Sequence, residues 1–167
     1  LATPEYAYQI ADNNVHPDAS WTIQMQEVKA RAIAETEAGR GWMIRRPKAT
    51  RTGTVIVLDF DSLRPDEHLT LHDPARYGGQ GIDAFAGFEA VGTTIAAMEI
   101  TGRQVRLTCA GVPTGVRYAY QQQDCTGFAG NLWTGHRGLL RTSDTWSSKL
   151  LADVVLYRWI PSFRITL

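Results

Sequence analysis

Apolar positions in the first part of the chain recur every three or four residues, which predicts one long amphipathic helix. The apolar stripe consists of Trp21, Met25, Val28 and Ala32. Ser20 is a suitable N-cap for this helix, because its hydroxyl can accept a hydrogen bond from a free backbone N–H group. Gly39 and Gly41 are expected to end the helix, since glycine readily takes the left-handed conformation found after helix ends.

From Thr52 onward the pattern changes to short β-type runs, separated by glycine, proline and aspartate. The runs cover residues 54–60, 68–72, 93–100, 104–109, 116–120, 154–160 and 163–165. Strands that follow one another without intervening helices are typical of an antiparallel β-sandwich. The predicted fold class is therefore mainly β, with a jelly-roll-like sandwich preceded by a loop and a helix.

Two stretches are expected to be irregular. Residues 64–92 contain several glycines, and we expect much of this stretch to form an exposed loop. The basic segment Arg45–Lys48, together with Arg51, is interpreted as a solvated hinge in preference to a binding patch.

Composition and charge narrow the possible functions. Hydrophobic residues make up 44% of the chain and five tryptophans are present, which supports a buried core. The 17 basic and 17 acidic residues are interspersed and cancel, so no electrostatic case exists for binding nucleic acid or an anionic membrane. The chain shows neither a signal peptide nor an apolar run near the ~20 residues of a membrane helix.

The cysteines and histidines predict no metal site. Cys109 lies in an apolar run and is expected to be a small buried hydrophobe, while Cys125 lies in a polar stretch. A disulfide between them stays open, because it depends on a separation that the sequence does not give. His68, His72 and His136 lack the spacing of metal ligands.

His16 is the candidate catalytic residue. It lies in Asn14–Pro17, just ahead of the predicted helix, where a loop can expose an imidazole to a reacting hydroxyl. A general base also needs a carboxylate that fixes its tautomer, and Asp12 is near enough in sequence to do this. The alternative is a helix-entry turn with a surface histidine of no catalytic role.

A second group of residues could bind a ligand. Arg117 lies within an apolar strand, where an arginine usually packs its aliphatic stem and forms a half-buried ion pair. Tyr120 and Trp133, with Tyr118, could instead present ring faces to a sugar, although aromatic residues of a sandwich are more often core. Asn131 lies in the long polar stretch 121–135, and long loops often carry function.

Four blocks of the chain, in their order, resemble the C-terminal region of sialate O-acetylesterase-like SGNH hydrolases. They are Asn14–Pro17, then Gly87–Ala90 with the run to Ile100, then Val116–Tyr120, and finally Asn131–Trp133 with Gly138–Leu140 and Arg141–Asp144. The resemblance implies that residues 1–46 are the end of an SGNH catalytic domain and that residues 47–167 are a β-sandwich domain. It implies His16 as the base of a serine esterase that removes acetyl groups from surface glycans. No metal or organic cofactor is needed for that reaction.

The chain departs from the family pattern at two points. An aspartate usually stands three residues before the histidine, where this chain has Asn13, so either Asp12 or Asn13 would orient the ring. The blocks that carry the serine nucleophile and the oxyanion hole are also missing. An upstream portion of the same protein, or another chain, would have to supply the serine.

The strand Leu156–Trp159 also resembles esterase modules of bacteriophage tail spikes. This implies an extracellular or virion location, an acetylated glycan or polysaccharide as partner, and a possible homotrimer. The candidate glycan-binding residues are Arg117, Tyr120, Asn131 and Trp133. The alternatives are a carbohydrate-binding or oligomerising β-sandwich without catalytic activity, and a structural virion domain.

Overall fold

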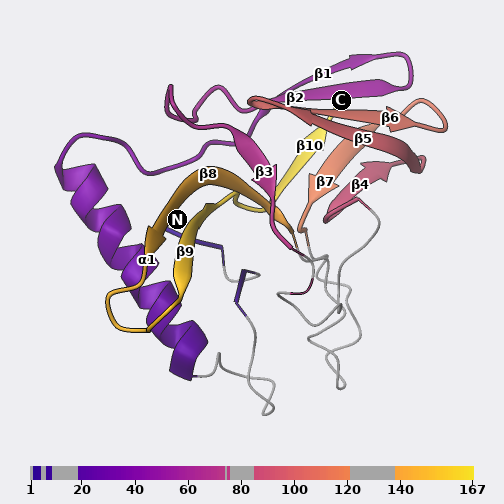
Figure 1. Cartoon of the computed structure of the whole chain (residues 1–167). Helices are drawn as coiled ribbons and strands as arrows, with labels where there is room; N and C mark the ends of the chain where they lie inside the picture. Colours follow the sequence, from indigo (N-terminus) through magenta and orange to yellow (C-terminus); the bar gives the residue numbers. More distant parts are fainter. Residues whose placement is uncertain (1, 5–6, 9–18, 74, 76–84, 121–137) are drawn as a thin grey trace.

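The computed structural model describes residues 2–4, 7–8, 19–73, 75, 85–120 and 138–167 (Figure 1). The described residues form one helix and ten strands. These are α1 (Ala19–Glu37), β1 (Lys48–Thr52), β2 (Val55–Asp59), β3 (Leu69–Leu71), β4 (Phe88–Val91), β5 (Ile95–Thr101), β6 (Gln104–Cys109), β7 (Gly115–Tyr118), β8 (Leu140–Ser147), β9 (Val155–Trp159) and β10 (Phe163–Thr166).

The strands form three antiparallel sheets, so the prediction of a mainly β, antiparallel fold is confirmed. The sheet orders are β1-β2-β6-β5, β10-β7-β4 and β3-β8-β9. The first two sheets share one apolar core, as in a sandwich, and α1 lies beside β8 and β9 of the third (Figure 1). The boundary between residues 46 and 47 stays a prediction.

The core between the first two sheets follows from strict alternation along their strands. In β2 and β6, every second side chain is buried, namely Ile56, Leu58, Val105 and Leu107. The period of two sends these side chains to one face, while the other face carries the half-buried Val55 and Val57 of β2 and polar residues of β6. Phe88, Tyr118 and Phe163 of the opposite sheet pack on one another against this face, with ring centroids 4.7–6.3 Å apart.

Tyr118 connects the sandwich to the third sheet. Its side chain is fully buried, and its hydroxyl accepts a hydrogen bond of 2.8 Å from the Leu140 backbone N–H at the start of β8. Gly138 passes so close that a Cβ atom there would lie 2.1 Å from the Tyr118 hydroxyl. The interpretation of Tyr118 as a core residue, in preference to a sugar-binding one, therefore agrees with its burial.

The helix end is as predicted, but its start is not. Gly39 has a φ of 72°, and the N–H groups of Gly39 and Arg40 donate to the carbonyls of Thr36 and Glu35, each at 3.0 Å. This pair of bonds is the Schellman motif, which requires the left-handed conformation at Gly39. Ser20 is not the N-cap, because α1 already begins at Ala19.

Three strands were missed by the sequence pattern. Strand β1 was interpreted as part of a basic hinge, because only Ala49 of its five residues is even partly buried. Strand β4 lies in the stretch expected to be a loop, and Phe88 supplies its only buried side chain. Strand β8 alternates in burial, but its more buried positions include the polar residues Thr142 and Asp144, so no apolar–polar alternation marks it. Strands β4 and β8 pair with strands that are distant in sequence, β7 and β3. Strand β1 is almost fully exposed and pairs with the apolar strand β2 that follows it.

We expect Tyr118→Phe to lower the free energy of unfolding by about 1–3 kcal/mol, because the Leu140 N–H would then be buried without its acceptor. Urea denaturation followed by circular dichroism measures this change. Tyr120→Phe is the matched control, since Tyr120 is only half-buried. Equal stability of the two variants would contradict the proposed role of the hydroxyl.

Candidate functional site

Most of the predicted site residues lie outside the described part of the chain. These are the expected catalytic residues His16, Asp12 and Asn13, and the expected glycan-binding residues Asn131 and Trp133. Arg117 and Tyr120 are described, and the structure brings these two together.

Arg117 lies in the middle of β7, between Glu89 of β4 and Arg164 of β10. Its neighbours Val116 and Tyr118 are buried, so alternation directs the half-buried Arg117 to the opposite, outer face of the sheet. Its guanidinium carbon lies 5.8 Å from the Tyr120 ring centroid, within the range of a cation–π interaction.

The turn between Tyr118 and Tyr120 uses an uncommon backbone conformation. Ala119 is buried and has a φ of 44°, and its N–H donates to the Gly87 carbonyl at 2.9 Å. A positive φ is unfavourable for alanine and persists only where surrounding contacts impose it. Here it ends β7 and separates the core residue Tyr118 from the half-buried Tyr120.

A second cluster of chemically capable side chains lies on the sheet β3-β8-β9. We call it the ring cluster, and it consists of His72, Arg141, Tyr157 and Trp159. The His72 ring lies 4.7 Å from that of Tyr157 and 5.2 Å from that of Trp159, both edge to face. The Arg141 guanidinium carbon lies 4.5 Å from the centroid of the Tyr157 ring.

The topology explains why these four residues meet. Arg141 is the Cα partner of Trp159 across β8 and β9, and Tyr157 is two residues before Trp159, on the same face. The His72 N–H donates to the carbonyl of Leu139 at 2.8 Å, which brings this histidine beside the start of β8. The spacing of two between Tyr157 and Trp159 is visible in the sequence, but no pattern links these residues to Arg141 or His72.

The ring cluster also contacts the beginning of α1. Trp159 is buried together with Ala7 and Tyr8, and Trp21, Met25 and Tyr157 pack against this group. Trp21 and Met25 belong to the first two turns of the helix. The first turns of α1 and the ring cluster therefore form one packed unit.

The other face of β9 carries a buried ion pair. Arg158 is 2% exposed and Glu67 is 5% exposed, and one Arg158 terminal nitrogen donates to Glu67 at 2.5 Å. The same guanidinium donates through Nε to the Trp42 carbonyl at 3.1 Å. The Glu67 carboxylate also accepts from the Thr142 hydroxyl at 3.3 Å and from the Arg64 backbone N–H at 2.9 Å.

The polar network extends from this pair toward α1. Nη2 of Arg31 in α1 donates to both carboxylate oxygens of Asp144 at 3.2 Å, and the Arg31 guanidinium carbon lies 4.0 Å from the Trp146 ring centroid. Arg64 reaches Glu35 at 2.9 Å and Asp144 at 3.6 Å. These contacts attach the helix to β8, and their role is structural.

Asp144 lies within an irregularity in the pairing of β8 with β9. Between the paired residues Arg141 and Thr145, β8 has three residues where β9 has only Arg158. The Asp144 N–H donates to the Thr142 hydroxyl at 3.2 Å inside this irregularity. Thr142 and Asp144 alternate with the same parity as the buried Leu140, so their polar side chains face the buried network.

The pKa values of the Asp144 and Glu35 carboxyl groups are shifted in opposite directions. Burial raises the pKa of Asp144, and the charges of Arg31 and Arg64 only partly oppose this effect. The hydrogen bond from Arg40, with the charges of Arg64 and Arg31, lowers the pKa of Glu35 against a smaller effect of burial.

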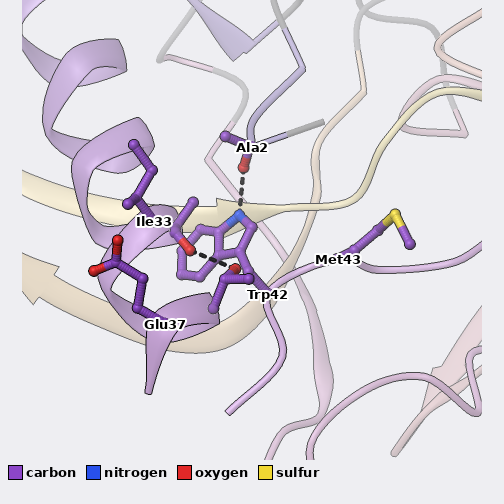
Figure 2. Close-up of a pocket in the computed structure, with 7 residues that line it drawn as sticks. Ala2, Ile33, Glu37, Trp42 and Met43 are labelled. Carbon is purple, nitrogen blue, oxygen red and sulfur yellow. Dashed lines mark hydrogen bonds between the residues drawn. The ribbon is translucent and has the colours of Figure 1, made fainter. Parts of the chain in front are cut away.

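A groove of about 340 Å³ lies between α1 and the segment that follows it (Figure 2). Its lining consists of Ala2, Ala32, Ile33, Thr36, Glu37, Trp42 and Met43. The Trp42 indole N–H donates to the Ala2 carbonyl at 2.5 Å, and the Thr36 hydroxyl donates to the Ala32 carbonyl at 2.7 Å. Among the described residues that line it, Glu37 has the only ionisable side chain, so the groove holds no acid–base pair for catalysis.

No group of His, Cys, Asp and Glu side chains suited to a metal ion occurs among the described residues. In the same part of the chain, no helix is long and apolar enough to cross a membrane. Cys109 is a buried free thiol, and burial raises its pKa. Its predicted role as a small buried hydrophobe is confirmed, while Cys125 lies outside the described residues.

Comparison with known proteins assigns the chain to no established family, because no family model, curated protein or solved structure matches it. Its function must therefore be inferred from its own residues and geometry.

The two carboxylates should affect stability with opposite dependence on pH across the range where carboxyl groups titrate, about pH 3 to 7. The raised pKa of Asp144 means that its contribution is present at low pH and is lost as pH rises. Asp144→Asn should therefore gain stability relative to the wild type with rising pH. Because the pKa of Glu35 is lowered, Glu35→Gln should lose stability relative to the wild type with rising pH.

Urea denaturation of both variants and the wild type at several pH values measures these two trends. Asp66→Asn is a suitable control, since Asp66 is exposed. Parallel trends for the two variants would show that the network is not charged as described.

Proposed function

We propose that the chain is the C-terminal portion of a carbohydrate O-acetylesterase that removes acetyl groups from surface glycans. His16 accepts the proton of a serine hydroxyl supplied by another part of the protein or by another chain. Asp12, or less effectively Asn13, orients the imidazole. The serine attacks the ester carbonyl, the protonated His16 then donates its proton to the departing sugar hydroxyl, and water releases acetate from the acyl-enzyme.

One observation carries this proposal: the ring cluster packs against the first turns of α1. In the sequence, His16 precedes the first residue of α1 by three positions. A glycan esterase needs a sugar-binding surface beside its base, so that the acetyl group is held in position for attack. Aromatic side chains suit the apolar faces of sugar rings, and arginine and histidine supply polar contacts.

Other contacts in the described part of the chain support the proposal, because they hold α1 in a fixed position. Arg31, Asp144 and the buried Arg158–Glu67 pair hold α1 against β8 and β9. A base on the loop before a fixed helix keeps its orientation better than one on a free segment. An extracellular or virion location and a homotrimeric assembly, as in tail-spike esterases, are part of the same proposal.

We expect His16→Ala to lower kcat/KM for acetyl-ester hydrolysis by about 10²–10⁴-fold, because a positioned base contributes a factor of that size. The assay is hydrolysis of p-nitrophenyl acetate by the protein that carries this chain together with its serine. His68→Ala is the matched control, since His68 is an exposed histidine.

An unchanged kcat/KM in His16→Ala would exclude His16 as the base. A loss of activity in both histidine variants would point to a general effect on folding, which circular dichroism of the two proteins identifies.

A second candidate function is a carbohydrate-binding module without catalysis, and the Arg117–Tyr120 pair favours it. This pair lies on the outer face of β10-β7-β4, where a sugar could bind without any serine. If this is the binding site, Tyr120→Ala should weaken glycan binding about tenfold, since one ring contact is worth roughly 0.5–1.5 kcal/mol beyond its area.

Glycan-array screening followed by calorimetry, with Tyr120→Phe as the conservative control, measures this effect. Equal affinity of Tyr120→Ala and the wild type for every glycan bound would remove this site from consideration.

A further inference from the structure

We propose that Arg141 binds the carboxylate of an acidic sugar, so that the glycan is a uronic-acid-type polysaccharide. This inference rests on the proposed function, because it names the substrate class of the ring cluster.

Arg141 has hydrogen-bond donors that the described part of the chain does not use. Its Nη1 donates to the Thr142 carbonyl at 3.0 Å, but its Nε is buried and has no hydrogen-bond partner. No carboxylate of a described residue forms an ion pair with this guanidinium. A buried unpaired donor is costly. The Nε of Arg64 is also buried without a partner, but Arg64 pairs with carboxylates, so the lack of a carboxylate partner is what distinguishes Arg141.

The contrast with the arginines of the polar network is informative. Arg31, Arg64 and Arg158 each contact at least one carboxylate within 3.2 Å. Arg141 comes from the same sheet as Arg158 but contacts only a backbone carbonyl and the Tyr157 ring. The chain thus neutralises the arginines on one side of the sheet and leaves Arg141 without a counter-ion among the described residues.

The shape of the guanidinium selects the ligand. Nη1 and Nη2 form the end-on fork of the guanidinium, whose two parallel N–H bonds match the two oxygens of a planar carboxylate. Burial also lowers the pKa of Arg141, since removal from water disfavours its charge. A bound anion would offset that cost, and a neutral sugar would not.

The surrounding rings suit the remainder of such a sugar. Tyr157 lies against the guanidinium and Trp159 lies beside its Cα position across the strands, with the His72 ring in contact with both aromatic rings. An acidic sugar would place its carboxylate on Arg141 and its ring carbons against the half-buried Tyr157 ring, while the buried Trp159 lies behind it.

The test follows the side-chain Nε–H signal of Arg141 by NMR in the full chain labelled with ¹⁵N-arginine. Arg141→Lys identifies the signal by its loss. Oligosaccharides of glucuronate and of galacturonate are titrated in parallel with their methyl esters and with dextran sulfate. We expect a saturable downfield shift of this signal with at least one uronate and none with its methyl ester.

Affinity measurements on variants complete the test. Arg141→Lys and Arg141→Gln should weaken uronate binding about tenfold or more, because a charge-assisted bidentate contact is lost. Arg106→Gln removes the same charge from an exposed position of β6 and should bind like the wild type. Thermal unfolding of each variant separates loss of the contact from loss of the fold.

Three outcomes would overturn the inference: no uronate preferred over its methyl ester, a shift of Arg141 with dextran sulfate alone, or full affinity in Arg141→Gln. Binding of a neutral acetylated glycan, with hydrolysis that depends on His16, would leave the proposed esterase intact in each case. The failure of the inference and the failure of the proposed function are thereby distinguishable.

Discussion

The buried ion pair between Arg158 and Glu67 is the interaction on which the arrangement of the third sheet depends. Two charges removed from water are costly unless each is fully hydrogen-bonded. Here the Trp42 carbonyl, the Thr142 hydroxyl and the Arg64 N–H complete the bonding of the pair. Four segments that are distant in the sequence, around Trp42, Arg64 with Glu67, Thr142 and Arg158, must therefore meet at one point, which fixes how the segment after α1, β8 and β9 lie together.

This constraint gives the sheet β3-β8-β9 two different faces. One face is closed by the charged network and the helix, where every interaction holds the fold together. The other carries the ring cluster, which packs against the first turns of α1. Since β9 alternates, Arg158 belongs to the first face while Tyr157 and Trp159 belong to the second. A short strand thus supplies both the structural anchor and the proposed sugar-binding surface.

Local patterns predicted some elements well and others poorly. The end of α1 followed from Gly39, because its left-handed conformation is a local property. Strands β2 and β6 followed from their alternation, since each buries one full face. Strand β8 could not be found in this way, because its more buried positions include the polar residues Thr142 and Asp144. The described candidate residues Arg117 and Tyr120 were predicted, whereas Arg141 and His72 were not.

By itself, the sequence determined the fold class, the long helix and the core strands, because these depend on periods of apolar residues along one segment. It also singled out His16 and the pair of Arg117 and Tyr120 as candidates for function. Only the tertiary structure decided that Arg141 has no counter-ion among the described residues and which rings surround it. That information arises from contacts between β3, β8 and β9. Pairing between strands that are distant in sequence produces no periodic pattern within one segment, so the sequence alone does not reveal it.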